Sequence, residues 1–123
     1  MNTNLVADTL KSALKVHYAR VYRNRAPSNP TTPYVVFNAD SVLDTYPSHD
    51  YMVYVNIVDN HNNPVRAIET LADTIDNDLN HKVIDLPTIN MHLLRSMRQP
   101  IPANDLVDAQ MVQIQYTVRV YFK

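Results

Sequence analysis

The chain has 123 residues, of which 46% are hydrophobic and 19% charged, and its formal net charge at pH 7 is −1. This length suits one domain with a single core, and a near-neutral molecule has no general electrostatic reason to bind nucleic acid tightly. No run approaches the ~20 apolar residues of a membrane span, so no membrane association is expected. Cysteine is absent, which excludes disulfides and thiolate chemistry and is compatible with a cytoplasmic protein.

Glycine is also absent, although average usage of ~7% predicts about nine residues. Glycine-rich phosphate loops, dinucleotide fingerprints and nucleophile elbows all need glycine for positive φ or close backbone approach. None of these sites can be built here. The thirteen asparagines are expected to take the left-handed turn positions instead, because asparagine tolerates that region best after glycine.

A first amphipathic helix is predicted near the N-terminus, because apolar residues recur there at three- and four-residue steps. Thr3 or Asn4 can cap its start, and Lys11 and Lys15 lie on its polar side. The expected buried face consists of Leu5, Val6, Leu10, Ala13, Leu14 and His17. A short extended piece follows at residues 21–22.

Residues 22–33 then form a polar loop with three prolines, each of which fixes φ and removes a backbone donor. The aromatic and β-branched residues that follow predict a strand from Tyr34 to about Leu43. Residues 44–48 are expected to turn, and residues 51–58 to return as a second strand with both faces partly apolar.

The second helix is predicted from Pro64 to Leu79, with Asn63 as its N-cap and Asn80 as a left-handed stop. A further strand is expected around residues 89–93, followed by a second proline loop over residues 99–106. In the last strand, residues 111–122 alternate cleanly, and the even-numbered side should pack against the helices. These elements predict a single α+β domain over residues 1–123, with four main antiparallel strands in one sheet and two amphipathic helices packed on one face.

Five histidines and the acids of the second helix are the candidate residues for metal binding or acid–base chemistry. The nearest approaches to a metal-ligand pair are Asp59 with His61 and His49 with Asp50, whereas zinc sites use three or four ligands. The helix carboxylates should be exposed opposite the apolar stripe, where burial cannot tune their pKa values for acid–base work. We therefore expect no metal, no cofactor and no enzymatic activity.

Charge is divided unevenly along the chain. Residues 1–25 carry a net charge of +4 and residues 40–85 a net charge of −7. Such a division suits head-to-tail contact between identical subunits, although two solvated faces would explain it equally well. The residues expected to make charge-complementary contacts are Lys11, Lys15 and Arg20 on one side and Glu69, Asp73 and Asp76 on the other.

The sheet face away from the helices is expected to be partly apolar, with polar side chains of the last strand beside it. A monomer seldom leaves such a face bare, so part of it should meet a neighbour, unless residues 23–33 fold over it. The apolar members are Tyr34, Val36, Met52, Tyr54, Val58, Leu94 and Met111.

The order of these elements around residues 22–37 carries a family resemblance. The run Tyr22-Arg23, the proline-rich loop and the entry Pro33-Tyr34-Val35-Val36 into a small sheet resemble the tail-completion and tail-terminator proteins of long-tailed bacteriophages. The resemblance is one of pattern and size over nearly the whole chain. The complete lack of glycine departs from the family pattern and affects the expected turn conformations.

The resemblance implies a structural virion protein that forms a homo-oligomeric ring, as a hexamer, at the head-proximal end of the tail tube. It would terminate tail growth, join tail to head, and contact the tail tube protein and a head-connector protein. DNA would pass through the lumen without specific binding. The implied location is the virion, after assembly in the host cytoplasm. The expected oligomer and lumen face consists of Met52, Tyr54, Gln113, Gln115, Thr117 and Arg119.

The two proline loops are the candidates for contact with adjoining rings, because prolines lower the entropy cost of ordering a loop on binding. The candidate residues are Arg23, Arg25, Asn29, Pro30, Pro100 and Asn104. Three alternatives stay open: a head-closure or connector neck protein of the same virion, a small non-catalytic binding module with a groove on its sheet face, and a nucleic-acid-binding domain. The last would need a basic aromatic sheet, whereas Tyr34 and Tyr54 have mostly neutral neighbours.

Overall fold

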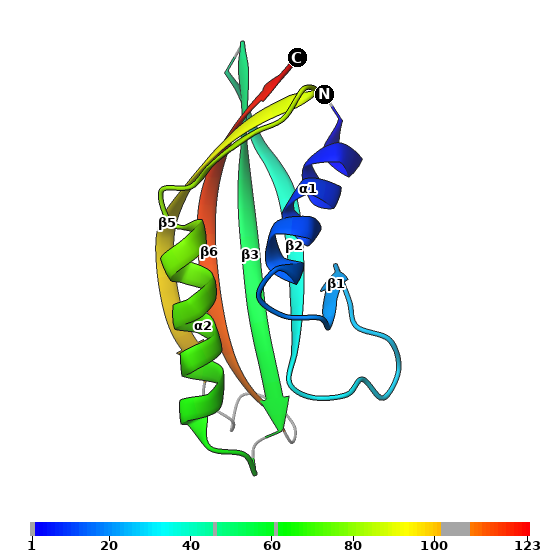
Figure 1. The fold of residues 1–123 in the computed structure, drawn as a ribbon, viewed down its shortest axis with the longest axis vertical. Helices are drawn as coiled ribbons and strands as arrows, with labels where there is room; N and C mark the ends of the chain where they lie inside the picture. The colour runs from blue at the N-terminus through cyan, green and yellow to red at the C-terminus, as the bar shows by residue number, and fades with distance from the viewer. Residues whose placement is uncertain (1, 46, 61, 102–108) are drawn as a thin grey trace.

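The computed structural model describes residues 2–45, 47–60, 62–101 and 109–123. Within these ranges the chain forms two helices and six strands (Figure 1). In chain order they are α1 (Thr3–Lys15), β1 (Val21–Arg23), β2 (Tyr34–Thr45), β3 (Ser48–Asn60), α2 (Val65–Leu79), β4 (Val83–Asp85), β5 (Ile89–Ile101) and β6 (Ala109–Phe122). Both helices lie against the same side of a long, curled sheet.

The sheet is mixed and has the strand order β1-β2-β3-β6-β5-β4. The prediction of four main antiparallel strands is therefore wrong. β1 joins the sheet parallel to β2, and β4 joins it antiparallel to β5. Each of these strands has only three residues, which is too short for an alternating pattern to reveal a strand in the sequence.

The core lies between the helices and the sheet. The odd-numbered residues of β3 from Tyr51 to Ile57 and the even-numbered residues of β6 from Val112 to Val120 are buried. This confirms the side of β6 that was expected to face the helices. From the helices, the core receives Val6, Ala7, Leu10, Leu14, Ile68, Ala72, Ile75 and Leu79. The Val, Leu and Ile side chains among them contribute about 1.5–3 kcal/mol each when they are fully buried, so this layer stabilises the fold.

The helix ends differ from the prediction. α1 is capped by Asn2, whose side chain accepts a hydrogen bond from the Leu5 amide at 3.0 Å. In α2 the capping position belongs to Pro64, without a side-chain capping hydrogen bond, and the Asn63 side chain donates to Asp59 Oδ1 at 2.9 Å. At the other end of α2, Asn80 is extended and His81 takes the left-handed conformation, with φ of 67°.

Turn positions partly follow the expectation for asparagine. Asn24 and Asn29 have positive φ values of 68° and 53° in the loop between β1 and β2. The second proline loop begins later than predicted, because β5 continues through Pro100 to Ile101. Pro100 pairs with Val112 near the end of an edge strand, where a missing N–H is tolerated. Residues 102–108, with the candidate residue Asn104, lie outside the described residues.

Candidate assembly surface

The sheet face opposite the helices, which we call the bare face, brings together the six residues predicted as an oligomer and lumen surface. Strand pairing places them on two central neighbours, β3 and β6, and their side chains point away from the helices because their odd or even partners fill the core. The six are Met52, Tyr54, Gln113, Gln115, Thr117 and Arg119. Thr117 and Arg119 are exposed, and the other four are half-buried.

A row of amide side chains crosses the bare face. Gln113 of β6 donates to Asn56 Oδ1 of β3 at 2.9 Å, and Gln99 of β5 donates to Gln113 Oε1 at 3.5 Å. Gln115 also donates to Gln113 Oε1, at 3.3 Å. These bonds satisfy the amides within the sheet and leave a polar surface without net charge. Such a surface can meet another polar surface without the desolvation cost of a buried ion.

Apolar side chains lie on both sides of this amide row. At one end of the face Tyr34, Val58 and Met111 share a row across β2, β3 and β6, and the ring of Tyr22 packs edge-on against Tyr34 at 6.2 Å. Beyond the amides Met52 pairs with Thr117, which pairs in turn with Leu94 of β5. Leu94 is 52% exposed, so residues 23–33 do not cover that part of the face.

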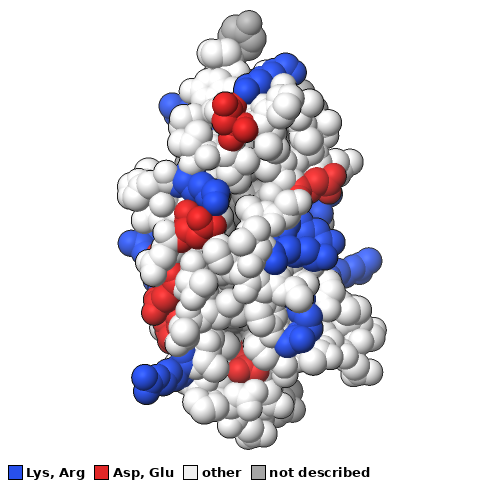
Figure 2. All heavy atoms as spheres, in the orientation of Figure 1, with Lys and Arg blue, Asp and Glu red and all other residues white. Residues whose placement is uncertain are grey.

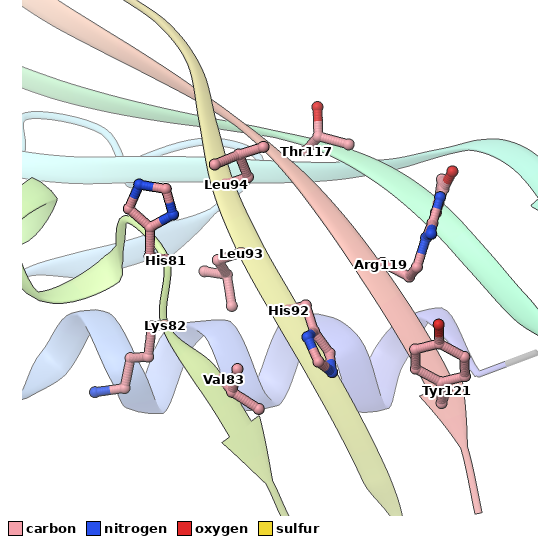
Figure 3. Close-up of a pocket in the computed structure, with 10 residues that line it drawn as sticks. His81, Lys82, Val83, His92, Leu93, Leu94, Thr117, Arg119 and Tyr121 are labelled. Atoms are coloured by element: carbon pink, nitrogen blue, oxygen red, sulfur yellow. The ribbon is translucent and has the colours of Figure 1, made fainter.

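The charged end of the bare face contains a hollow of about 510 Å³. It lies over β4, β5 and β6 and is lined in part by His81, Val83, His92, Leu94, Arg119 and Tyr121 (Figure 3). Arg119 Nε donates to Asp50 Oδ1 at 3.2 Å, and this bond raises the pKa of Arg119. The rings of His92 and Tyr121 meet at 5.9 Å between centroids. Sequence reasoning missed this hollow, because it depends on the unpredicted strand β4.

The acidic side chains of α2 are neutralised within the subunit. Arg98 of β5 contacts Glu69 Oε2 at 2.6 Å and Asp73 Oδ1 at 2.7 Å. Partial burial acts to lower the pKa of Arg98, but the hydrogen bonds to these two carboxylates outweigh it and raise the pKa. Figure 2 shows the acidic side chains of α2 as a column on the left of the view. Glu69 and Asp73 were predicted to pair with a neighbouring subunit, and any such contact would have to compete with their ion pairs to Arg98.

Asp76 is buried, which corrects the expectation that the α2 carboxylates are all exposed. Its side chain is 6% exposed, forms an ion pair with Arg95 and accepts a hydrogen bond from the Tyr116 hydroxyl at 2.8 Å. Burial, together with this bond to Asp76, raises the pKa of Tyr116. The helical spacing placed Asp76 on the polar side, but the long strand β5 curves beneath that side and supplies Arg95 as its partner.

The predicted basic contacts belong to α1, which contains Lys11 and Lys15, and to the segment after it, which contains Arg20. Lys15 is exposed, whereas Lys11 is half-buried. Arg20 is occupied within the subunit, because its Nε donates to the Pro33 carbonyl at 3.0 Å and its guanidinium packs over the Tyr18 ring. Of the three, Lys15 therefore extends furthest into solvent.

The candidate loop residues lie at one end of the strands but on opposite edges of the sheet, because Pro100 of β5 shares a cross-strand row with Val35 at the start of β2. Arg23 ends β1 and donates to Asn4 Oδ1 at 2.8 Å, while Arg25 and Asn29 are exposed in the loop that follows. Pro30 is half-buried, and Pro100 is exposed in β5. The structure does not bring the β1–β2 loop and Pro100 into one site.

The histidines do not assemble a metal site in the described part of the chain, where no three His, Asp or Glu side chains come together. His17, at the end of α1, contacts Asp78 Oδ2 of α2 at 2.7 Å, and Lys82 contacts the same carboxylate at 3.0 Å. The hydrogen bond from His17, and then that from Lys82, hold the pKa of Asp78 below its ordinary value. This pairing joins the ends of two helices. Neither described helix is long and apolar enough to cross a membrane.

Comparison with known proteins gives the fold. No protein-family model and no curated protein matches this chain. One similar solved structure is a chain from the virion of a native gene transfer agent particle, with a TM-score of 0.66, 12% identity and coverage of 87% of this chain and 83% of that one. Another, which has only a sequence identifier for a name, gives a TM-score of 0.72 at 15% identity and covers 100% of this chain and 98% of its own. At such identities the likeness establishes a shared fold.

Proposed function

We propose that this protein is a structural, non-enzymatic subunit of a phage or phage-like particle. It forms a ring at the head-proximal end of the tail tube, where it terminates tail growth and joins tail to head. The observation that carries the proposal is the bare face: an amide-rich and apolar surface, with a paired Arg119 and Asp50 at one end, on a fold shared with a chain of a gene transfer agent virion. Its partners would be further copies of itself, the tail tube protein and a head-connector protein.

The electrostatics of the bare face suit a wall beside DNA. Among the outward residues of β3 and β6 that the structure describes, Arg119 is the one cation, and it is paired with Asp50. Phosphate binding depends on several free Lys or Arg side chains, so this part of the face should not hold passing DNA. The amide row provides a surface that is hydrated and without net charge.

The role can be tested by deleting the gene from its parent phage or prophage and examining the induced lysate by negative-stain electron microscopy. A tail terminator predicts filled heads separated from tails of irregular, excessive length, with both defects reversed by a plasmid copy of the gene. Normal-length tails beside emptied heads would instead assign the protein to the head side of the neck. Intact, infectious particles would refute a role in the virion.

The hollow over β4, β5 and β6 favours a second candidate, a small non-catalytic binding module. Its lining combines aliphatic side chains with Arg119, His81 and His92, which could hold a small ligand or a peptide end with an apolar part and a negative charge. This candidate predicts a stable monomer and no defect in particle assembly. The lysate experiment therefore separates the two functions directly.

A further inference from the structure

The sheet has two exposed edges that its short outer strands leave uncovered. β1 pairs only with Val35–Phe37 of β2, and β4 pairs only with Asn90–His92 of β5. Among the described residues, no other strand lies on the outer side of β2 or β5. We call Asp40, Leu43 and Asp44 the β2 edge, and Leu94, Met97 and Gln99 the β5 edge. All six residues are exposed.

These edges carry large apolar side chains in contact with solvent. Leu43 is 54% exposed on the β2 edge, and Leu94 and Met97 are 52% and 48% exposed on the β5 edge. Leu43 pairs with Asp50, and Met97 pairs with Gln115, so both side chains belong to the bare face. Two strands that met along these edges would place Leu43 and Met97 on the same side, where they could bury each other.

The directions of the strands also match. β2, β3, β6 and β5 are joined by three successive antiparallel pairings, so β5 runs opposite to β2. If the β5 edge of one copy met the β2 edge of the next, the sheet would continue with another antiparallel pair. The contact joins two different surfaces, which is the arrangement that forms a ring when the rotation between subunits closes.

Charge favours the same contact. The β2 edge contains two carboxylates, Asp40 and Asp44, and no Lys or Arg. Asp44 contacts His49 at 3.3 Å within the subunit, but its side chain remains 75% exposed. The β5 stretch beside it in such a pairing contains Arg95 and Arg98 and no acid, although Arg98 is already held by Glu69 and Asp73 within its own subunit. Arg95 already binds Asp76, but its side chain remains 42% exposed. Pairing of two β2 edges would bring like charges together. Pairing of a β2 edge with a β5 edge would bring carboxylates beside an arginine, so charge favours the second arrangement.

We propose that copies of this protein assemble by antiparallel pairing of the β5 edge of one subunit with the β2 edge of the next. This inference rests on the proposed self-assembly and specifies the contact between neighbouring subunits, which we call the joint. Within one subunit, Leu43 lies in the same cross-strand row as His92, and Met97 lies in the same row as Asn38. Pairing Met97 of one subunit with Leu43 of the next therefore displaces the second subunit by about four residues, or ~13 Å along the strands. A closed sheet absorbs such a shift by tilting its strands relative to the ring axis.

The absence of native cysteine allows a direct test by cross-linking. Leu43→Cys and Met97→Cys are made as separate variants with tags of different length, mixed over a series of concentrations, and oxidised mildly. Non-reducing gels should show the mixed 43–97 dimer several-fold above both homodimers. The matched control mixes Val16→Cys with Val65→Cys, which are 77% and 56% exposed on helix ends away from both edges. The double variant L43C/M97C should give a ladder that stops at a closed oligomer.

A 43–97 yield no higher than the control yield would overturn the proposal, as would a dominant 97–97 dimer. In that case the register shifts at Ser41/Leu43 and Arg95/Met97 act as bulges that protect the edges. A second variant pair checks the same joint without oxidation: Leu43→Lys should weaken association, and adding Met97→Glu to the other partner should restore it. Circular dichroism verifies that each variant is folded.

The lysate experiment distinguishes a wrong joint from a wrong function. Overlong tails in the deletion strain without a 43–97 link would refute the edge pairing and leave the proposed function intact. A 43–97 link together with intact particles in the deletion strain would support the joint and refute the virion role.

Discussion

The two faces of this sheet are built by alternate residues of the same strands, yet they differ in chemistry. In β6 the even-numbered residues from Val112 to Val120 are aliphatic or aromatic and are buried on the side of the helices, whereas Gln113, Gln115, Thr117 and Arg119 point to the other side. The covered face is fully packed against the two helices of the same subunit. The bare face satisfies its amides laterally and leaves apolar groups at its edges. The contrast indicates that one face holds the subunit together and the other is available to a second molecule.

Neighbouring residues of β6 provide the strongest test of this contrast. Ile114→Ala removes a fully buried side chain and should lower the free energy of unfolding by about 2–5 kcal/mol, because it loses apolar burial and leaves a cavity. Gln113→Ala, one residue away on the bare face, should cost less than about 1 kcal/mol. Urea unfolding measures both. Equal losses would show that the bare face is a second part of the core.

The polar side of α2 should give the next largest effect. Asp76→Ala should destabilise the fold by about 2–3 kcal/mol, because it leaves the Tyr116 hydroxyl and the Arg95 guanidinium without their shared acceptor. Asp73→Ala removes an acid on the same helix that is 62% exposed, and it should cost less than about 1 kcal/mol. Similar urea midpoints for the two variants would contradict a structural role for the buried carboxylate.

A change on the bare face should separate assembly from stability. Tyr54→Glu places a charge at the centre of that face, and we expect a change in unfolding free energy of at most about 1 kcal/mol. In the gene-deleted phage, a plasmid that encodes this variant should fail to restore normal tails, because the charge would be buried at a contact. Val16→Glu makes a similar change at an exposed end of α1 and should restore them. Restoration by both variants would remove the bare face from assembly.

The smallest expected effect concerns acid stability. The pKa of Asp78 is lowered from 3.8, first by the hydrogen bond from His17 and then by that from Lys82. The ionised carboxylate therefore stabilises the fold above about pH 4, and this contribution is lost as the pH falls through the lower, folded-state pKa. Between about pH 5 and about pH 2, the free energy of unfolding of the Asp78→Asn variant should fall by about 0.5–1 kcal/mol less than that of the unchanged chain.

Urea unfolding at a series of pH values measures this difference. His17→Ala should flatten the pH dependence in the same direction, because it removes the largest cause of the lowered pKa. His92→Ala changes a histidine on the bare face and serves as the control. An Asp78→Asn profile parallel to that of the unchanged chain would rule out this linkage between the two helices.

Periodicity in the sequence was sufficient for the long elements. The helical stripes predicted α1 and α2, and strict alternation predicted β6 together with the side that is buried. It also placed Gln113, Gln115 and Thr117 on one face. It failed for β1 and β4 as sheet members, because three residues carry too little pattern, and for the extent of β5, because Pro100 suggested a loop. Without those strands, neither the hollow nor the exposed edges could be predicted.

The sequence by itself determined which residues alternate along a strand. It also excluded glycine-dependent chemistry and showed that the chain has a basic start and an acidic middle. Only the tertiary structure decided what those charges do, because Arg95 and Arg98 come from a strand distant in sequence and neutralise the α2 acids. It also decided which edges of the sheet stay uncovered. Local sequence sets the direction in which a side chain points along its own element, whereas its partner depends on which distant segment packs beside it.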